Sequence, residues 1–107
     1  MRFLATLIVA TAAATMPTAT AHAADAAESL ARNSGCLACH TVDKKLVGPA
    51  YKDIAAKYRG KPGAEAELAK KVKAGGKGNW GDIPMPPNAH VKDADIQAIV
   101  KWILTIK

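Results

Sequence analysis

The chain has 107 residues and a formal net charge of +6, from 15 Lys and Arg against 9 Asp and Glu. The basic residues are scattered among acidic ones, which argues against nucleic-acid binding, although a positive patch could still steer acidic protein partners. The length allows one small domain and no second one. A domain of this size usually needs stabilisation beyond its own apolar core.

Residues 1–23 are predicted to be a signal peptide that is removed on export. Arg2 supplies the positive start, an almost uninterrupted apolar run extends from Phe3 to Ala14, and Ala21-His22-Ala23 fits the small-x-small cleavage pattern. The apolar run is short for a membrane span. We therefore expect no stable membrane insertion; a retained N-terminal anchor is the alternative.

The predicted mature domain, residues 24–107, has 84 residues and a net charge of +5, because Arg2 is the only charged residue of the leader. Few of its aromatic side chains have a clear chance of burial: Tyr51, Trp80 and Trp102, with Tyr58 in addition. A covalently held cofactor would supply the apolar mass that such a core lacks.

A first helix is predicted from Asp25 to Gly35. Asp25 and Glu28 form a capping-box pattern at its start, and glycine is a favourable residue at a helix C-terminus. The segment Cys36-Leu37-Ala38-Cys39-His40 follows directly and is typical of c-type haem attachment. Each of the two thiols can add across a haem vinyl group, and the neutral imidazole of His40 can bind the iron.

Three other interpretations of this motif are weaker. A redox Cys-x-x-Cys needs a strand-helix-strand setting, which the flanking sequence lacks. A closed zinc site needs four ligands, and Cys36, Cys39, His40 and His90 form an irregular set. A disulfide between the two cysteines would close a very small loop and leave the histidine without a role. Because haem attachment takes place outside the bacterial cytoplasm, the motif and the leader together predict a periplasmic protein.

The middle of the chain is predicted to contain two short helices. After a loop from Thr41 to Pro49, the segment Ala50 to Tyr58 places Tyr51, Ile54, Ala55 and Tyr58 on one face. A second helix spans Ala64 to Ala74, with Leu68 and Val72 one turn apart and Gly75-Gly76 at its end. No segment of the chain has a pattern typical of a sheet.

A long segment without regular structure is predicted from Lys77 to Lys92, and a loop of that length in so small a domain indicates function. It contains Met85, the only methionine of the predicted mature chain, between Pro84 and Pro86. Prolines reduce the freedom of the unfolded loop, which favours holding a weak thioether ligand on iron. His90 is the alternative sixth ligand; two histidines would lower the reduction potential relative to a His/Met pair.

The last predicted helix begins with Asp93 as its cap and Asp95 in its first turn. Apolar residues recur along it at helical spacing, which predicts simple core packing: Ile96, Ile99, Val100, Ile103 and Leu104. Trp102 is expected to pack against the first helix.

The whole predicted mature chain resembles the small bacterial class I cytochromes c of the cytochrome c-551/c-552 group. The segments that carry the resemblance are 35–40, 46–53, 63–69, Trp80-Gly81 and 83–88. The resemblance implies an all-α class I cytochrome c fold, with about four helices around one covalently bound haem c per chain. It also implies an electron-transfer protein rather than an enzyme.

The resemblance further implies roles for single residues near the haem. Pro49 matches the proline whose carbonyl accepts the hydrogen bond of the ligand histidine, and Asn88 the asparagine that hydrogen-bonds near the methionine sulfur. Trp80 matches the tryptophan whose indole N–H meets a haem propionate. Where relatives often carry an arginine near that propionate, this chain has Lys71, which cannot make a bidentate contact.

These expectations combine into a monomeric, soluble one-electron carrier with His40 and Met85 on the iron. The haem edge near Cys36 and Cys39 would be the electron port, within a contact patch of small or apolar residues: Val47, Gly48, Pro49, Ile83, Pro84 and Pro86, with Lys44 and Lys45 at its rim. The resemblance suggests redox partners such as a nitrite reductase, a terminal oxidase, a cytochrome peroxidase or a quinol-oxidising complex. A haem enzyme or gas sensor, and a haem subunit of a larger complex, are the alternatives.

Overall fold

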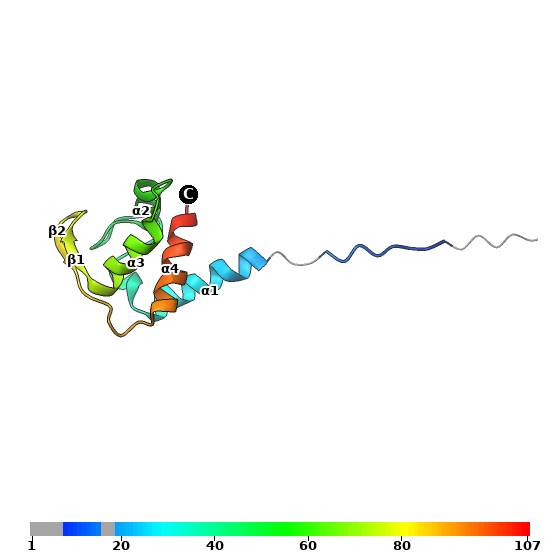
Figure 1. Cartoon of the computed structure of the whole chain (residues 1–107), viewed down its shortest axis with the longest axis horizontal. Helices are drawn as coiled ribbons and strands as arrows, with labels where there is room; N and C mark the ends of the chain where they lie inside the picture. The colour runs from blue at the N-terminus through cyan, green and yellow to red at the C-terminus, as the bar shows by residue number, and fades with distance from the viewer. Residues whose placement is uncertain (1–7, 16–18) are drawn as a thin grey trace, which may run out of the picture.

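The computed structural model describes residues 8–15 and 19–107 of the chain. Its elements are α1 (Ala19–Asn33), the short 3-10 helix η1 (Cys36–Ala38), α2 (Tyr51–Tyr58), α3 (Ala64–Ala74), β1 (Gly76–Gly78), β2 (Gly81–Met85) and α4 (Asp93–Thr105). Figure 1 shows the helices gathered around α4, with the β1–β2 hairpin at the side of the domain away from the N-terminal extension. Arg2 and Phe3, which begin the predicted leader, lie outside the described residues.

The predicted α-helical elements are present, and the all-α fold class is confirmed. The segment 64–74 forms a helix with the predicted bounds, and α2 begins one residue later than predicted. Helix α1 differs, because it begins at Ala19 and not at Asp25. Alanine has the highest helix propensity, so the alanine-rich segment before Asp25 continues the helix. Glu28 does not cap the helix but pairs with Arg32, one turn on, at 3.5 Å.

Helix α4 is the centre of the core, because it packs against α1, α2 and α3. Four of the five residues in its predicted apolar stripe are buried, and Leu104 is half-buried: Ile96, Ile99, Val100 and Ile103 form the buried set. Ile99 and Ile103 pack in one cluster with Ala31 of α1 and Tyr51 of α2, and half-buried Trp102 lies against it. Ile96 and Val100 pack with Val91 in a second cluster, next to Leu68 and Val72 of α3.

The expectation that nothing in the chain forms a sheet was wrong. Strands β1 and β2 form a short antiparallel hairpin, with Gly76 opposite Met85 and Gly78 opposite Gly81. All eight of their residues are exposed except Met85, so the hairpin lacks the alternation of buried and exposed positions by which a strand is recognised. Trp80, in the turn of this hairpin, is 43% exposed, whereas the sequence had given it a clear chance of burial.

Asp93 does not cap α4, contrary to expectation. Lys92 occupies the N-cap position without a side-chain cap, and Asp93 is the first residue of the helix. Its carboxylate instead forms an ion pair with Lys73 of α3 at 2.9 Å. The Asp93 carboxylate therefore contacts a distant side chain, Lys73, instead of capping its own helix. Asp93 and Asp95 still lie in the first turn, where the helix dipole favours negative charge.

Two adjacent alanines of α2 test the packing of this core. Ala55 is completely buried, whereas Ala56 beside it is exposed. We expect Ala55→Leu to lower the free energy of unfolding by about 1–3 kcal/mol through overpacking. Ala56→Leu should change it by less than about 0.5 kcal/mol. Denaturant titration of both variants measures the difference; equal effects would contradict the packing described here.

Candidate functional site

The helices and the hairpin surround a predominantly apolar cavity, part of which is open to solvent. The motif residues Cys36, Cys39 and His40 line it, and so does Met85. Helix α4 contributes the apolar side chains of Ile99, Val100 and Ile103. The residues that the sequence assigned to cofactor attachment and to both axial positions therefore meet at one cavity.

The short helix η1 brings the motif together. The backbone N–H groups of Cys39 and His40 both donate to the carbonyl of Cys36, at 3.2 and 3.1 Å. Both thiols are half-buried and free. Burial raises the pKa of the Cys36 thiol above its ordinary value, and a hydrogen bond with the Tyr51 hydroxyl opposes that rise. Burial, with Cys36 beside it, also raises the pKa of Tyr51.

The imidazole of His40 is held in one orientation. It is 8% exposed, and its Nδ1 lies 2.8 Å from the carbonyl oxygen of Pro49. Because a carbonyl can only accept, Nδ1 donates in this bond and therefore carries the proton. The lone pair of a neutral imidazole is then on Nε2, the state in which histidine binds a metal ion. The arrangement of Pro49 and His40 agrees with the geometry that the sequence resemblance implied.

Two further residues, Tyr51 and Gly48, confine this ring, although their sequence patterns indicated other roles. The ring of Tyr51 stacks on His40 with centroids 5.2 Å apart, and Trp102 meets Tyr51 edge-on at 5.6 Å. Gly48 approaches so closely that a Cβ atom there would lie 2.5 Å from Cε1 of the ring. The helical spacing of Tyr51 indicated only core packing, and Gly48 was expected only in the contact patch, so neither pattern identified the contact with His40.

Met85 ends strand β2 and is half-buried. The backbone passes close to it at Gly75, directly after α3, where a Cβ atom would lie 2.5 Å from the Met85 carbonyl oxygen. Gly75 also has a φ of 71°, a conformation that other residues rarely adopt. Glycine at this position therefore allows α3 to end against the methionine segment. His90, the alternative ligand, is exposed and does not line the cavity.

Asn88, Trp80 and Lys71 lie around the same region. The Asn88 side-chain amide donates to the carbonyls of Val72 at 3.0 Å and Pro86 at 3.3 Å. Both of its N–H groups are thus used, so the predicted bond near the Met85 sulfur would need one of them released. Trp80 and Lys71 both line the cavity.

Lys57 of α2 holds the turn of the hairpin. Its ammonium donates to the Asn79 carbonyl at 2.9 Å and lies 4.5 Å from the centre of the Trp80 ring. A lysine on an exposed helix face gives no sign of such a contact in the sequence.

Among residues 8–15 and 19–107, no helix is long and apolar enough to cross a membrane.

Comparison with known proteins places these features in one family. Residues 24–107 match the sequence profile of the family described as Cytochrome c. The chain is 64% identical over 75 residues to cytochrome c-551 of Allochromatium vinosum, covering 70% of this chain and 80% of that protein. It is 59% identical over 80 residues to cytochrome c-551 of Pseudomonas aeruginosa, covering 75% of this chain and 76% of that protein.

A solved structure is also similar. The crystal structure of wild-type Nitrosomonas europaea cytochrome c552 superimposes with a TM-score of 0.73 and 56% sequence identity. The match covers 75% of this chain and 99% of that one.

The close approach of Gly48 to His40 gives a direct test of the site. We expect Gly48→Ala to displace the ring and break its bond to Pro49, because the added methyl group would overlap the imidazole. The NMR signal of the ring N–H should then be lost or exchange faster with water.

Gly60→Ala is the matched control. Gly60 has a φ of 75° and no atom within 4 Å of an added Cβ, so this change strains the backbone without touching His40. Its ring N–H signal should be retained. An unchanged signal in Gly48→Ala would show that the ring is not confined as described.

Proposed function

Since the chain belongs to the cytochrome c family, we propose that it is a periplasmic one-electron carrier with His40 and Met85 as the axial ligands of its haem iron. The protein is a small class I c-type cytochrome with covalently attached haem c, and it is an electron carrier rather than an enzyme. The compartment, the ligands and the partners are the proposal.

Cys36 and Cys39 are the proposed attachment points. Both line the cavity, and the turn of η1 presents them on the same side as His40. When bound, haem supplies an iron atom that takes up and releases one electron. The residues fit this group for two reasons. The cavity is lined mainly by apolar side chains, and the two candidate iron ligands, His40 and Met85, also line it.

The His40/Met85 assignment depends chiefly on the one observation that both residues line the cavity while His90 does not. The Pro49 carbonyl would orient the imidazole and increase its basicity, as partners of metal-binding histidines do. With a protein ligand on each side of the iron, no position is left for a substrate. This favours a carrier over a haem enzyme or gas sensor.

Four nearby residues have proposed supporting roles. Trp80 and Lys71 would lie beside the haem propionates, and their positions at the cavity wall support this. The Lys57 ammonium over the Trp80 ring would add positive charge to the same side. Asn88 would act on Met85 through the loop whose Pro86 carbonyl it binds.

The proposed location follows from the leader and the motif together. The family match starts at residue 24, directly after the predicted signal peptide 1–23. Haem is attached to this motif outside the bacterial cytoplasm, so the motif supports the export that the leader predicts.

An exposed apolar surface near the motif is the proposed docking site for redox partners. Leu46, Val47 and Ile83 are 54%, 47% and 63% exposed, and the last two also line the cavity. Transient redox encounters use small interfaces of this kind. The proposed partners are a nitrite reductase, a terminal oxidase, a cytochrome peroxidase or a quinol-oxidising complex, met by a monomeric carrier.

The docking surface can be tested without a partner by electron self-exchange between oxidised and reduced copies, followed by NMR line broadening. We expect Val47→Asp to slow self-exchange severalfold, because it places a charge in an apolar contact that must be desolvated. Gln97→Asp adds the same charge at an exposed position of α4 and should have little effect. Equal slowing in both variants would argue for a charge effect alone.

The axial assignment is tested by the optical spectrum of the oxidised protein. Wild type should show the weak far-red sulfur-to-iron band, Met85→Ala should lose it, and His90→Ala should keep it. A low-spin wild-type spectrum without the band would instead favour His90. A high-spin spectrum, or carbon monoxide binding by the native ferrous protein, would favour an enzyme or sensor.

A further inference from the structure

The segment 86–92 connects Met85 to α4 without a helix or strand of its own. Pro86 and Pro87 have no N–H group, so the first part of the segment cannot donate backbone hydrogen bonds. Its first anchor is Asn88, whose backbone N–H reaches the carbonyls of Val72 and Lys73 at 3.3 and 3.2 Å. The segment therefore depends on the end of α3 for its position.

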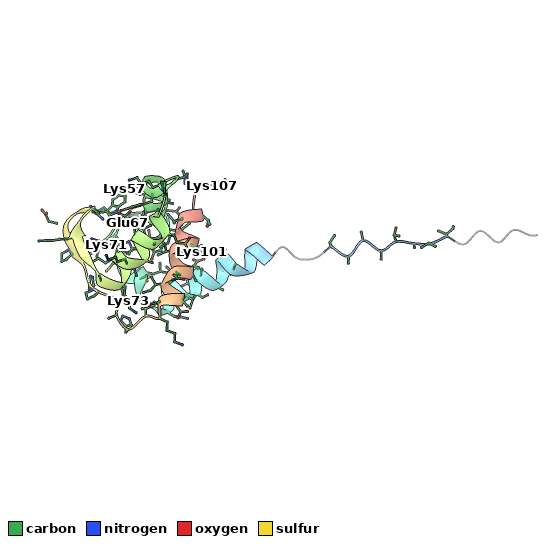
Figure 2. The ribbon with its side chains drawn as sticks, viewed as in Figure 1. Lys57, Glu67, Lys71, Lys73, Lys101 and Lys107 are labelled. Carbon is green, nitrogen blue, oxygen red and sulfur yellow. The ribbon has the colours of Figure 1, made fainter. Side chains whose placement is uncertain are left out.

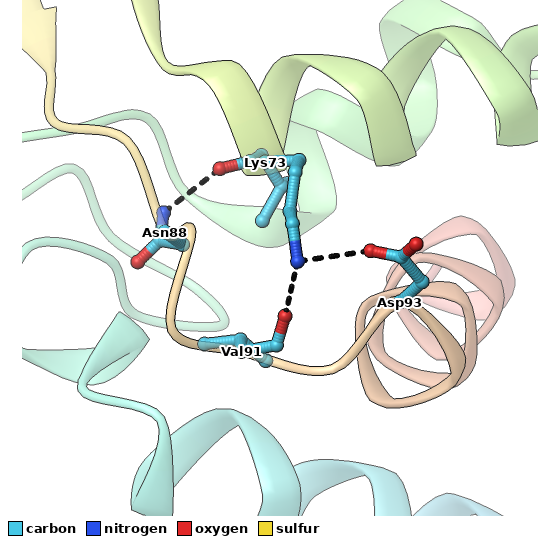
Figure 3. A network of polar contacts seen from close by, with 5 residues as sticks. Lys73, Asn88, Val91 and Asp93 are labelled. Atoms are coloured by element: carbon cyan, nitrogen blue, oxygen red, sulfur yellow. Dashed lines mark hydrogen bonds and ion pairs between the residues drawn. The ribbon is translucent and has the colours of Figure 1, made fainter.

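Lys73 makes a second anchor three residues further on. Its ammonium donates to the Val91 carbonyl at 2.7 Å and pairs with the Asp93 carboxylate at 2.9 Å. Figure 3 shows the Lys73 side chain reaching from α3 to both groups, while its backbone carbonyl faces Asn88. One residue thus holds the segment at Asn88 through its backbone and at Val91 through its side chain.

The two contacts of the Lys73 ammonium differ in strength. The Asp93 carboxylate is 80% exposed, and exposed ion pairs contribute little. Val91 is 7% exposed and packs against Ile96 and Val100, so the bond to its carbonyl lies at the edge of the core. A hydrogen bond is electrostatically stronger there than at the surface, because the local dielectric constant is lower. The contact with Val91 is therefore the more important one.

We propose that Lys73 is a positioning residue that keeps Met85 at the cavity by holding residues 88–91 against α3. This inference depends on the proposed ligation by Met85. An external ligand can replace Met85 only if the segment lifts away, and the Lys73 contacts oppose that movement. Lys71, two residues earlier, lines the cavity itself and has a different role; Figure 2 shows both side chains on the same part of α3.

Imidazole binding to the oxidised holoprotein tests this role, because imidazole is a neutral ligand that competes with methionine for the iron. We expect Lys73→Met, which keeps the apolar stem and removes the ammonium, to raise imidazole affinity at least about tenfold, because a hydrogen bond from a charged group contributes more than a neutral one. Asp93→Asn should raise it less than twofold. Titration against the far-red band gives the affinities.

Two controls separate positioning from other effects. Lys70→Met removes the same charge from an exposed position of α3, and Lys101→Gly weakens α4 at an exposed position without touching the segment (Figure 2). Neither should raise imidazole affinity. If imidazole affinity rose as much in Lys101→Gly as in Lys73→Met, Lys73 would be only a general stabilising residue and the proposal would be overturned. Equal affinities for Lys73→Met and wild type would also overturn it.

Amide hydrogen exchange supplies a readout that does not depend on the ligand. The N–H groups of Asn88 and Val91 should exchange faster in Lys73→Met while those of α2 stay protected. If wild type lacked the far-red band, the Met85 ligation would fail on its own. Exchange would still decide the anchoring role: unchanged rates at Asn88 and Val91 would overturn it, and faster rates would support it.

Discussion

The hydrogen bond between His40 and the Pro49 carbonyl is the contact on which the site depends. It sets the tautomer of the imidazole and, with Tyr51 stacked on the ring and Gly48 against its edge, leaves the ring one orientation. The loop that carries Pro49 is itself held to the motif, because the Gly48 N–H donates to the Cys39 carbonyl at 2.8 Å. Motif, loop and α2 therefore form one unit around the histidine.

The other side of the site is built differently. Met85 comes from a hairpin with little buried surface, and a proline-rich segment joins it to α4. Its position depends on the close approach of Gly75 and on the hydrogen bonds that join Asn88 and Val91 to the end of α3, rather than on core packing. A thioether is a weak ligand, so on the proposed ligation this side would be the first to open. The structure thus pairs a rigid histidine side with a methionine side held by a few identifiable bonds.

The sequence predicted those features that depend on local pattern. The apolar stripe of α4 and the buried face of α2 follow from helical spacing, and the haem-attachment motif carries its chemistry in five adjacent residues. It failed where a distant partner decides the outcome. Asp93 has the residue type of a cap but pairs with Lys73, and Lys57 and Lys73 have the pattern of solvated helix lysines. The hairpin was missed because its glycine-rich strands are exposed on both faces.

We propose that the iron of the holoprotein lies between the imidazole of His40 and the sulfur of Met85. X-ray absorption at the iron edge tests it most directly, because sulfur and nitrogen scatter differently in the first coordination shell. We expect one sulfur and five nitrogen ligands on the iron in both oxidation states. A shell of nitrogen alone, or a missing sixth ligand, would contradict it.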